Sequence, residues 1–172
     1  MTGSARSANV RQLSKRRKGE ETSLTTIQNL ACSNSGGLLP EGLAFPFDFG
    51  FIPSTLGDDG DPLDVMVLMD EPAHVGCLLD VRIIGVIEAV QVQDGKSETN
   101  NRLIAVSIHS YDHGELLSLD EINSSMLDQV EEFFISYNKS RGKKFKIKGR
   151  HGPKRASELM EIGMRAFQKK KP

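Results

Sequence analysis

The sequence of 172 residues predicts an α+β protein in which a small barrel of strands precedes the helices. Two observations carry this prediction. Between residues 45 and 108, apolar runs of strand length alternate with turns rich in Gly, Pro and Asp, which is typical of locally connected strands. From residue 126 onward, most apolar residues instead recur at the three- and four-residue spacing of one helical face.

The first predicted strand, residues 45–51, carries a phenylalanine at every second position. This period places the rings on one face, and the Pro and Gly residues between them indicate a short, bent strand. An acidic turn over residues 57–62 follows, and the apolar run Val65–Met69 is the next strand.

The following two strands are predicted to form a hairpin. Residues 77–87 have the composition of a strand that bends at Gly85, and residues 102–108 are the returning strand. The segment Asp94-Gly95-Lys96 between them is a hairpin signal.

Two helices and one short strand complete the chain. The apolar residues of the first helix, residues 126–137, have helical spacing, and Ser125 with Asp128 has the spacing of an N-terminal capping pair. Residues 145–148 alternate like a short strand, and Pro153 then opens the last helix. The apolar face of that helix holds Ala156, Leu159, Met160, Gly163 and Phe167.

Residues 1–38 have no sustained periodicity and are rich in Ser, Thr, Asn, Gly and basic residues. We therefore expect a divergent, flexible N-terminal arm over residues 1–38 and one folded domain over residues 39–172. The arm has room for one short element, and the spacing of Leu24, Ile27 and Leu30 suggests a helical face there.

The composition, with 38% hydrophobic and 26% charged residues, fits a soluble globular protein. No apolar run approaches the ~20 residues of a membrane-spanning helix, so no membrane association is expected. Cys32 and Cys77 have no Cys or His at ligand spacing, which argues against a zinc site and indicates reduced thiols in a cytoplasmic protein. The Arg- and Ser-rich start also has the composition of a mitochondrial transit peptide, although no apolar face recurs through it.

Charge is segregated along the chain although the net charge is -1. Residues 1–18 contain six cations and no acid, and residues 19–81 contain eleven acids and no Lys or Arg. Residues 139–155 contain nine cations and no acid. Such segregation produces local electric fields that the net charge does not report.

The acidic turn places Asp59, Asp61 and Asp64 within six residues. These carboxylates repel one another unless a cation joins them, and Mg²⁺ suits them because it takes carboxylate oxygens and keeps several waters. An EF-hand does not fit, because Leu63 would stand at a ligand position. The alternative interpretation is an acidic turn exposed to water.

The basic segment over residues 139–155 is suited to neutralise a phosphate group or to bind a nucleic-acid backbone. Its alternative is a solvated basic face. The single interleaved Phe145 and the absence of Trp argue against a stacking platform for single strands. We therefore rank nucleic-acid binding last among the functions considered.

These residues together resemble the soluble family I inorganic pyrophosphatases. The sequence motif Asp-Gly-Asp-Pro-hydrophobic-Asp-Val at Asp59–Val65 is quite specific to that family, and the resemblance covers roughly residues 38–165. The segments that carry it are Phe45–Pro53, Asp59–Val65, Gly85–Ile87, Leu103–Val106, Phe133–Phe134 and Tyr137.

The resemblance implies a five-stranded OB-like barrel flanked by two C-terminal helices, a homo-oligomer, and Mg²⁺-dependent hydrolysis of pyrophosphate to two phosphates. By their match to the family motif, Asp59, Asp61 and Asp64 would be metal ligands, and Asp61 would also orient and deprotonate the attacking water. The expected substrate contacts are Arg102 and Tyr137 by the same match, and Lys144 by its position in the basic segment.

Several charged positions of the family pattern are changed in this chain. Gln91 and Asn100–Asn101 occupy candidate positions of a second acidic pair, for which Asp94 is the nearest acid. Phe49 replaces a phosphate-binding Tyr, and Asn138 replaces a Lys. The alternative function is therefore a catalytically impaired relative that binds metal or phosphate, or that associates with a partner.

Overall fold

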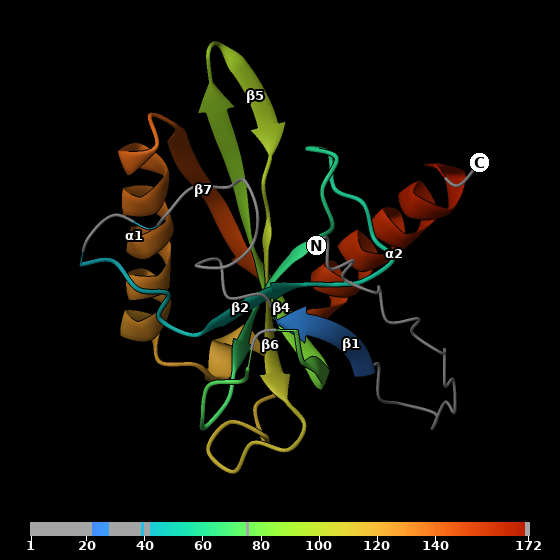
Figure 1. The fold of residues 1–172 in the computed structure, drawn as a ribbon. Helices are drawn as coiled ribbons and strands as arrows, with labels where there is room; N and C mark the ends of the chain where they lie inside the picture. Colours follow the sequence, from blue (N-terminus) through green and yellow to red (C-terminus); the bar gives the residue numbers. More distant parts are fainter. Residues whose placement is uncertain (1–21, 28–38, 40–41, 75, 171–172) are drawn as a thin grey trace, which may run out of the picture.

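The computed structural model describes residues 22–27, 39, 42–74 and 76–170, and most of its strands precede its helices (Figure 1). Its strands are β1 (Thr22–Ile27), β2 (Asp48–Phe51), β3 (Asp64–Leu68), β4 (Leu78–Gln93), β5 (Lys96–Thr99), β6 (Arg102–Ser107) and β7 (Lys144–His151). Its helices are α1 (Ser124–Ser140) and α2 (Pro153–Lys170), with a short 3-10 helix η1 (Leu119–Glu121).

Five strands are linked in a ring of pairings. β1 pairs with β2 and β4, β3 pairs with β2 and β6, and β6 pairs with β4. The β3–β6 pairing is parallel and the others are antiparallel. β5 and β7 pair with the C-terminal half of β4, which makes a mixed seven-stranded sheet. The predicted α+β class with an OB-like arrangement of strands is confirmed.

The bend predicted in the long strand β4 coincides with a register shift between Ile83 and Gly85. A side chain at Gly85 would place its Cβ 2.4 Å from Leu119 Cγ and 2.5 Å from the His151 carbonyl oxygen, so only glycine fits. At the hairpin tip, Asp94 and Gly95 have φ of 51° and 77°, as expected for the hairpin turn predicted there.

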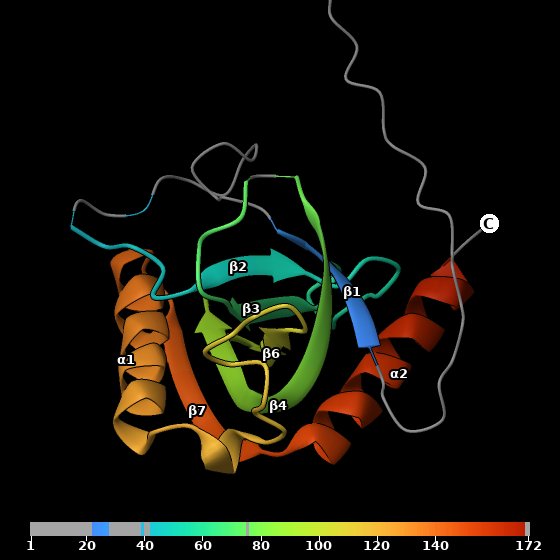
Figure 2. The same ribbon diagram turned by 90° about the horizontal axis from the view of Figure 1, so that it is seen from below.

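The two helices lie on different sides of the sheet, α1 beside β7 and α2 at the opposite side (Figure 2). Side chains of β3 alternate between the two resulting clusters. Met66 and Leu68 belong to the cluster that includes the apolar face of α1, whereas Val65 and Val67 pack in the cluster that includes Ala156 of α2. The core therefore fixes both faces of the strand that begins at the acidic turn.

Two predicted boundaries are wrong in detail. Asn123, and not Ser125, caps α1, because its side-chain oxygen accepts a hydrogen bond from the Ser125 amide at 2.9 Å. β2 begins only at Asp48, so Phe45 and Phe47 lie before the strand. Proline cannot donate to a ladder of hydrogen bonds, which is consistent with the unpaired bend at Pro46 and Phe47.

β1 lies within residues 1–38, the segment predicted as an arm, so the sheet extends across the predicted boundary. The suggested helical face is wrong for residues 22–27, which are strand. Their sequence, TSLTTI, is rich in β-branched residues, and the strand gives hydrogen-bonding partners to the edges of β2 and β4. The other residues of the predicted arm, including Cys32, lie outside the described residues.

Candidate active site

The acidic turn connects β2 to β3 and is closed by its own backbone. The Gly57 amide donates to the Asp61 carbonyl at 2.7 Å, and Asp59 Oδ1 accepts from the Asp61 amide at 3.1 Å. Gly60 has φ of +87°, a conformation that L side chains rarely adopt. Asp59 and Asp61 are thus held near each other at the tip of the turn, and both are exposed.

Buried contacts hold this turn against the rest of the domain. The buried Thr55 hydroxyl donates to the Ile52 carbonyl at 2.6 Å and accepts from the Leu63 amide at 3.0 Å. The Leu56 amide donates to the carbonyl of Gly163 in α2 at 3.0 Å. A network of this kind preorganises the carboxylates of the turn.

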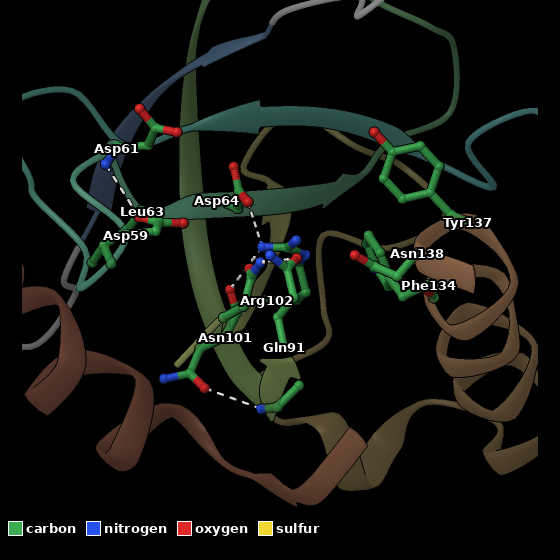
Figure 3. A network of polar contacts seen from close by, with 12 residues as sticks. Asp59, Asp61, Leu63, Asp64, Gln91, Asn101, Arg102, Phe134, Tyr137 and Asn138 are labelled. Carbon is green, nitrogen blue, oxygen red and sulfur yellow. Dashed lines mark hydrogen bonds and ion pairs between the residues drawn. The ribbon is translucent and has the colours of Figure 1, made fainter. Parts of the chain in front are cut away.

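Asp64 differs from the other two aspartates because it begins β3 and is partly buried. Its carboxylate forms an ion pair with Arg102, the first residue of β6 (Figure 3). Burial raises the pKa of Asp64, and the guanidinium of Arg102 opposes that shift. Although Asp59 is exposed, partial desolvation of its carboxylate raises its pKa, and the charge of Asp61 adds to the shift.

Arg102 is enclosed by three aromatic rings, and its side chain is only 7% exposed. The guanidinium carbon lies 5.0 Å from the ring centre of Phe134, 5.7 Å from that of Phe49 and 5.8 Å from that of Phe145. These distances are within the range of cation–π attraction. The sequence predicted aromatic rings on one face of residues 45–51, but not that rings from α1 and β7 meet Phe49 at one cation.

The candidate positions of the second acidic pair are adjacent in space but carry no charge. The Asn100 side-chain amide donates to Gln91 Oε1 at 3.0 Å, and Asn101 Oδ1 accepts from the Ala89 amide at 3.1 Å. Asp94 lies in the turn at the tip of the β4–β5 hairpin, and Glu98 of β5 is paired with Gln91 of β4. The Asn101 carboxamide thus stabilises the hairpin backbone, and the Asn100 and Gln91 carboxamides bond to each other without supplying a charge.

Tyr137 of α1 lies across the Asp64–Arg102 pair from the acidic turn in Figure 3. Its ring stacks on Phe133 with centres 6.0 Å apart, and its hydroxyl accepts a hydrogen bond from Arg141 at 2.6 Å. Asn138 is buried and donates to the Phe134 carbonyl at 2.8 Å, so its amide is used within the helix. Tyr137 and Arg141 thus form a polar pair at the end of α1.

Lys144 is not brought together with these groups. Side chains of a strand alternate between its faces, and the buried Phe145 points toward Arg102. Lys144, Lys146 and Lys148 are exposed and lie on the opposite face of β7. Within the part of the chain that the structure describes, none of these three lysines forms an ion pair.

The three aspartates expected to hold a metal interact electrostatically, because the charges of Asp59 and Asp61 both raise the pKa of Asp64. Among the described residues, no group of three or more His, Cys, Asp or Glu side chains is arranged to hold a metal ion. Asp59 and Asp61 still fit Mg²⁺, because Mg²⁺ is commonly bound by one or two carboxylates together with waters and substrate phosphates. The chemistry of these two oxygen donors fits the metal, whereas Asp64 already has a cation beside it.

Comparisons with known proteins show which family the chain resembles. Residues 21–168 match the family model described as inorganic pyrophosphatase. Proteins named inorganic pyrophosphatase from Nostoc sp. and Haloferax volcanii are each 34% identical to this chain, over 131 and 134 residues. The first alignment covers 76% of this chain and 75% of the relative, and the second covers 76% and 72%.

Solved structures show the same fold. The inorganic pyrophosphatase from Thermus thermophilus superposes with a TM-score of 0.77 at 24% identity, over 94% of this chain and 99% of that chain. The one from Coxiella burnetii gives 0.69 at 30% identity, over 76% and 77%. With its fold, its acidic turn and these relatives, the chain belongs to the inorganic pyrophosphatase family.

Proposed function

We propose that this protein hydrolyses inorganic pyrophosphate to two phosphates by attack of a water, with Mg²⁺ as the cofactor. The observation that carries the proposal is the acidic turn, which presents the exposed Asp59 and Asp61 and whose flanking backbone is hydrogen-bonded to a buried threonine and to α2. Family membership supports the same reaction, because the relatives are named for it.

In this proposal the three aspartates of the turn have different roles. Asp59 and Asp61 would hold Mg²⁺, which when bound lowers the pKa of water and neutralises phosphate charge. Asp61 would orient the attacking water and accept its proton, since its carboxylate is exposed and its backbone is fixed by Asp59 and Gly57. Asp64, the third expected ligand, is held by Arg102.

The phosphate contacts we propose are Tyr137 and its partner Arg141. The Tyr137 hydroxyl accepts from Arg141, so its own proton is available to donate to a phosphate oxygen. Arg141 lies over the Tyr137 ring at 5.5 Å and would add positive charge to the same place. Arg102, also expected as a substrate contact, acts here through Asp64 because its side chain is largely buried.

The test is phosphate release from pyrophosphate with and without Mg²⁺. Replacement of Asp61 by asparagine (Asp61→Asn) keeps the size of the side chain and removes the base, so release is expected to fall at least about 100-fold. Circular dichroism and thermal unfolding show whether the variant is folded. Release by the folded wild type that does not exceed that of the variant would reject the catalytic proposal.

A second candidate function is a metal- or phosphate-binding relative with impaired turnover. It is favoured by the Gln91–Asn100 hydrogen bond, which places carboxamides where a second acidic pair was expected. Calorimetry that detects binding of Mg²⁺ or pyrophosphate, in a protein that releases no phosphate, would favour this function over hydrolysis.

Two further proposals concern the cellular location and the oligomeric state of the protein. No helix among the described residues is long and apolar enough to cross a membrane. We propose a cytoplasmic location, tested by fractionation of cells that produce the full chain.

We also propose a homo-oligomer. Light scattering of the full chain at several concentrations would reject it if only the monomer mass appears.

A further inference from the structure

Leu63 lies in the chain between Asp61 and Asp64, and residues outside the acidic turn hold both of its backbone polar groups (Figure 3). Its amide donates to the Thr55 hydroxyl at 3.0 Å, and its carbonyl accepts from the Ile52 amide at 2.9 Å. Its side chain packs against the core cluster that includes a residue of α2. The backbone that carries the carboxylates is therefore connected to the core at Leu63.

The Thr55 hydroxyl completes the hydrogen bonding between Ile52 and Leu63. Phe51 and Asp64 form the last pair of the β2–β3 ladder, and in a regular antiparallel ladder the next two residues would exchange two direct backbone hydrogen bonds. Here one bond is direct, and the other passes through the Thr55 hydroxyl, which donates to the Ile52 carbonyl at 2.6 Å. Thr55 is only 1% exposed, so this hydroxyl is shielded from water.

Gly163 of α2 is the second contact that fixes Leu63. A Cβ atom at position 163 would lie 2.7 Å from Leu63 Cδ1 and 3.1 Å from Leu63 Cγ, so a side chain there would push Leu63 away. The Gly163 carbonyl also accepts a hydrogen bond from the Leu56 amide at 3.0 Å. Glycine is unfavourable inside a helix, and this close approach gives a physical reason for its presence.

The carboxylates around Leu63 carry like charges. Asp59, Asp61 and Asp64 lie within six residues, and in the described part of the chain the first two form no ion pair. Like charges repel, so these side chains tend to separate when no cation is bound. Ligands that are held in place before an ion arrives bind it more tightly. A fixed Leu63 limits the movement of the backbone on both of its sides.

We propose that Thr55 and Gly163 are positioning residues that hold the acidic turn through Leu63, so that Mg²⁺ binding and the packing of α2 stabilise each other. The inference rests on the proposed function for the binding of Mg²⁺ at this turn. Coupling of this kind is reciprocal, so loosening Leu63 weakens Mg²⁺ binding, and bound Mg²⁺ strengthens the contact with α2. The last helix, which contains none of the expected metal or substrate contacts, thereby contributes to the site.

The first test compares two replacements of Thr55 by calorimetric titration of the full chain with Mg²⁺ and no pyrophosphate. Thr55→Val keeps the shape of the side chain but leaves the Leu63 amide without its acceptor, so Mg²⁺ binding should weaken at least about tenfold. Thr55→Ser keeps the hydroxyl and should bind Mg²⁺ within about threefold of the wild type. Equal affinity in folded Thr55→Val and wild type overturns the inference.

A matched control separates positioning from a general loss of stability. Val130 is buried in the core cluster that includes the apolar face of α1, whereas Leu63 packs against the other cluster. Val130→Ala should therefore lower the Tm and leave the Mg²⁺ affinity within about twofold of the wild type. If Val130→Ala weakens Mg²⁺ binding as much as Thr55→Val does, the inference is overturned.

The second test introduces a side chain on α2. Gly163→Ala should weaken Mg²⁺ binding at least about fivefold, because its Cβ displaces Leu63. Alanine favours a helix more than glycine does, so this loss cannot arise from the helix itself. Leu63→Val removes the carbon atom closest to position 163, and in the Gly163→Ala background it should recover part of the affinity. Wild-type affinity in Gly163→Ala overturns the inference.

The third test uses the wild type alone and decides if Thr55→Val does not fold. Amide hydrogen exchange followed by NMR should slow at least about threefold at Leu56 and Leu63 when Mg²⁺ is saturating, because bound Mg²⁺ stabilises the hydrogen bonds of both amides. The amide of Val130 in α1 should exchange at an unchanged rate. Unchanged exchange at both Leu56 and Leu63 overturns the inference.

These tests separate the inference from the proposed function. A protein that binds Mg²⁺ with the expected losses in Thr55→Val and Gly163→Ala, but releases no phosphate from pyrophosphate, supports the inference and rejects hydrolysis. A protein that releases phosphate and has unchanged Mg²⁺ affinity in both variants overturns the inference and leaves hydrolysis intact. A wild type that binds no Mg²⁺ without pyrophosphate also overturns the inference, while phosphate release still tests hydrolysis.

Discussion

The two faces of β7 show how differently cations are used in this molecule. Its outer face presents Lys144, Lys146 and Lys148 to solvent without ion pairs within the described residues. Its inner face presents Phe145, which helps to enclose one arginine from β6 that is paired with Asp64. Strand alternation thus separates the three lysines of β7 from Arg102, and the cation paired with Asp64 stands alone in an apolar strand.

The largest loss in the free energy of unfolding is expected when the buried ring on the inner face of β7 is removed. Phe145→Ala should reduce the free energy of unfolding by about 3–5 kcal/mol, because a buried ring in contact with Phe134 and Arg102 is removed. Urea unfolding measures it. Lys144→Ala, one position away on the exposed face, should change that free energy by less than about 0.5 kcal/mol. Similar losses in the two variants would remove the distinction between the faces.

Next in size is the effect of breaking the buried pair. Arg102→Met should cost about 3 kcal/mol, because it leaves Asp64 without its cation. The 31% exposure of the Asp64 side chain puts this value at the lower end of the range for buried pairs. Arg102→Met combined with Asp64→Leu removes both charges and should recover most of the loss. If the double variant is less stable than Arg102→Met, the pair does not act as described.

The smallest effect is expected at an exposed pair. Arg165 and Glu161 form an ion pair of 3.0 Å one turn apart in α2, with side chains 72% and 55% exposed. Arg165→Ala should change the free energy of unfolding by less than about 0.5 kcal/mol, because water screens the interaction. Thermal unfolding in low and high salt checks this. A loss equal to that of Arg102→Met would mean that exposure does not govern the strength of these pairs.

Much of the fold followed from local patterns. The apolar run of β3, the Asp94-Gly95 turn, the bend at Gly85 and the start of α2 at Pro153 were all predicted, because each depends on residues close together in the chain. β1 was missed because its strand conformation depends on partners in β2 and β4 that are distant in sequence. Long-range pairing can override a weak local pattern.

The candidate site was also predicted only where it depends on residues close together in the chain. The acidic turn was predicted from one short sequence motif, and its hydrogen bonds hold Asp59 and Asp61 together. The surroundings of Arg102 were not predicted, since three rings from β2, α1 and β7 meet there only in three dimensions. Lys144 was selected by charge density, and strand alternation places it on the opposite face from Phe145.

Phosphate release from pyrophosphate tests the central claim most directly, when wild type, Asp61→Asn and Lys146→Ala are assayed side by side with and without Mg²⁺. The account predicts Mg²⁺-dependent release by the wild type and by Lys146→Ala within about twofold of each other, because the outer face of β7 is separate from the turn. It predicts a loss of at least about 100-fold in Asp61→Asn. Equal release by folded wild type and folded Asp61→Asn would contradict it.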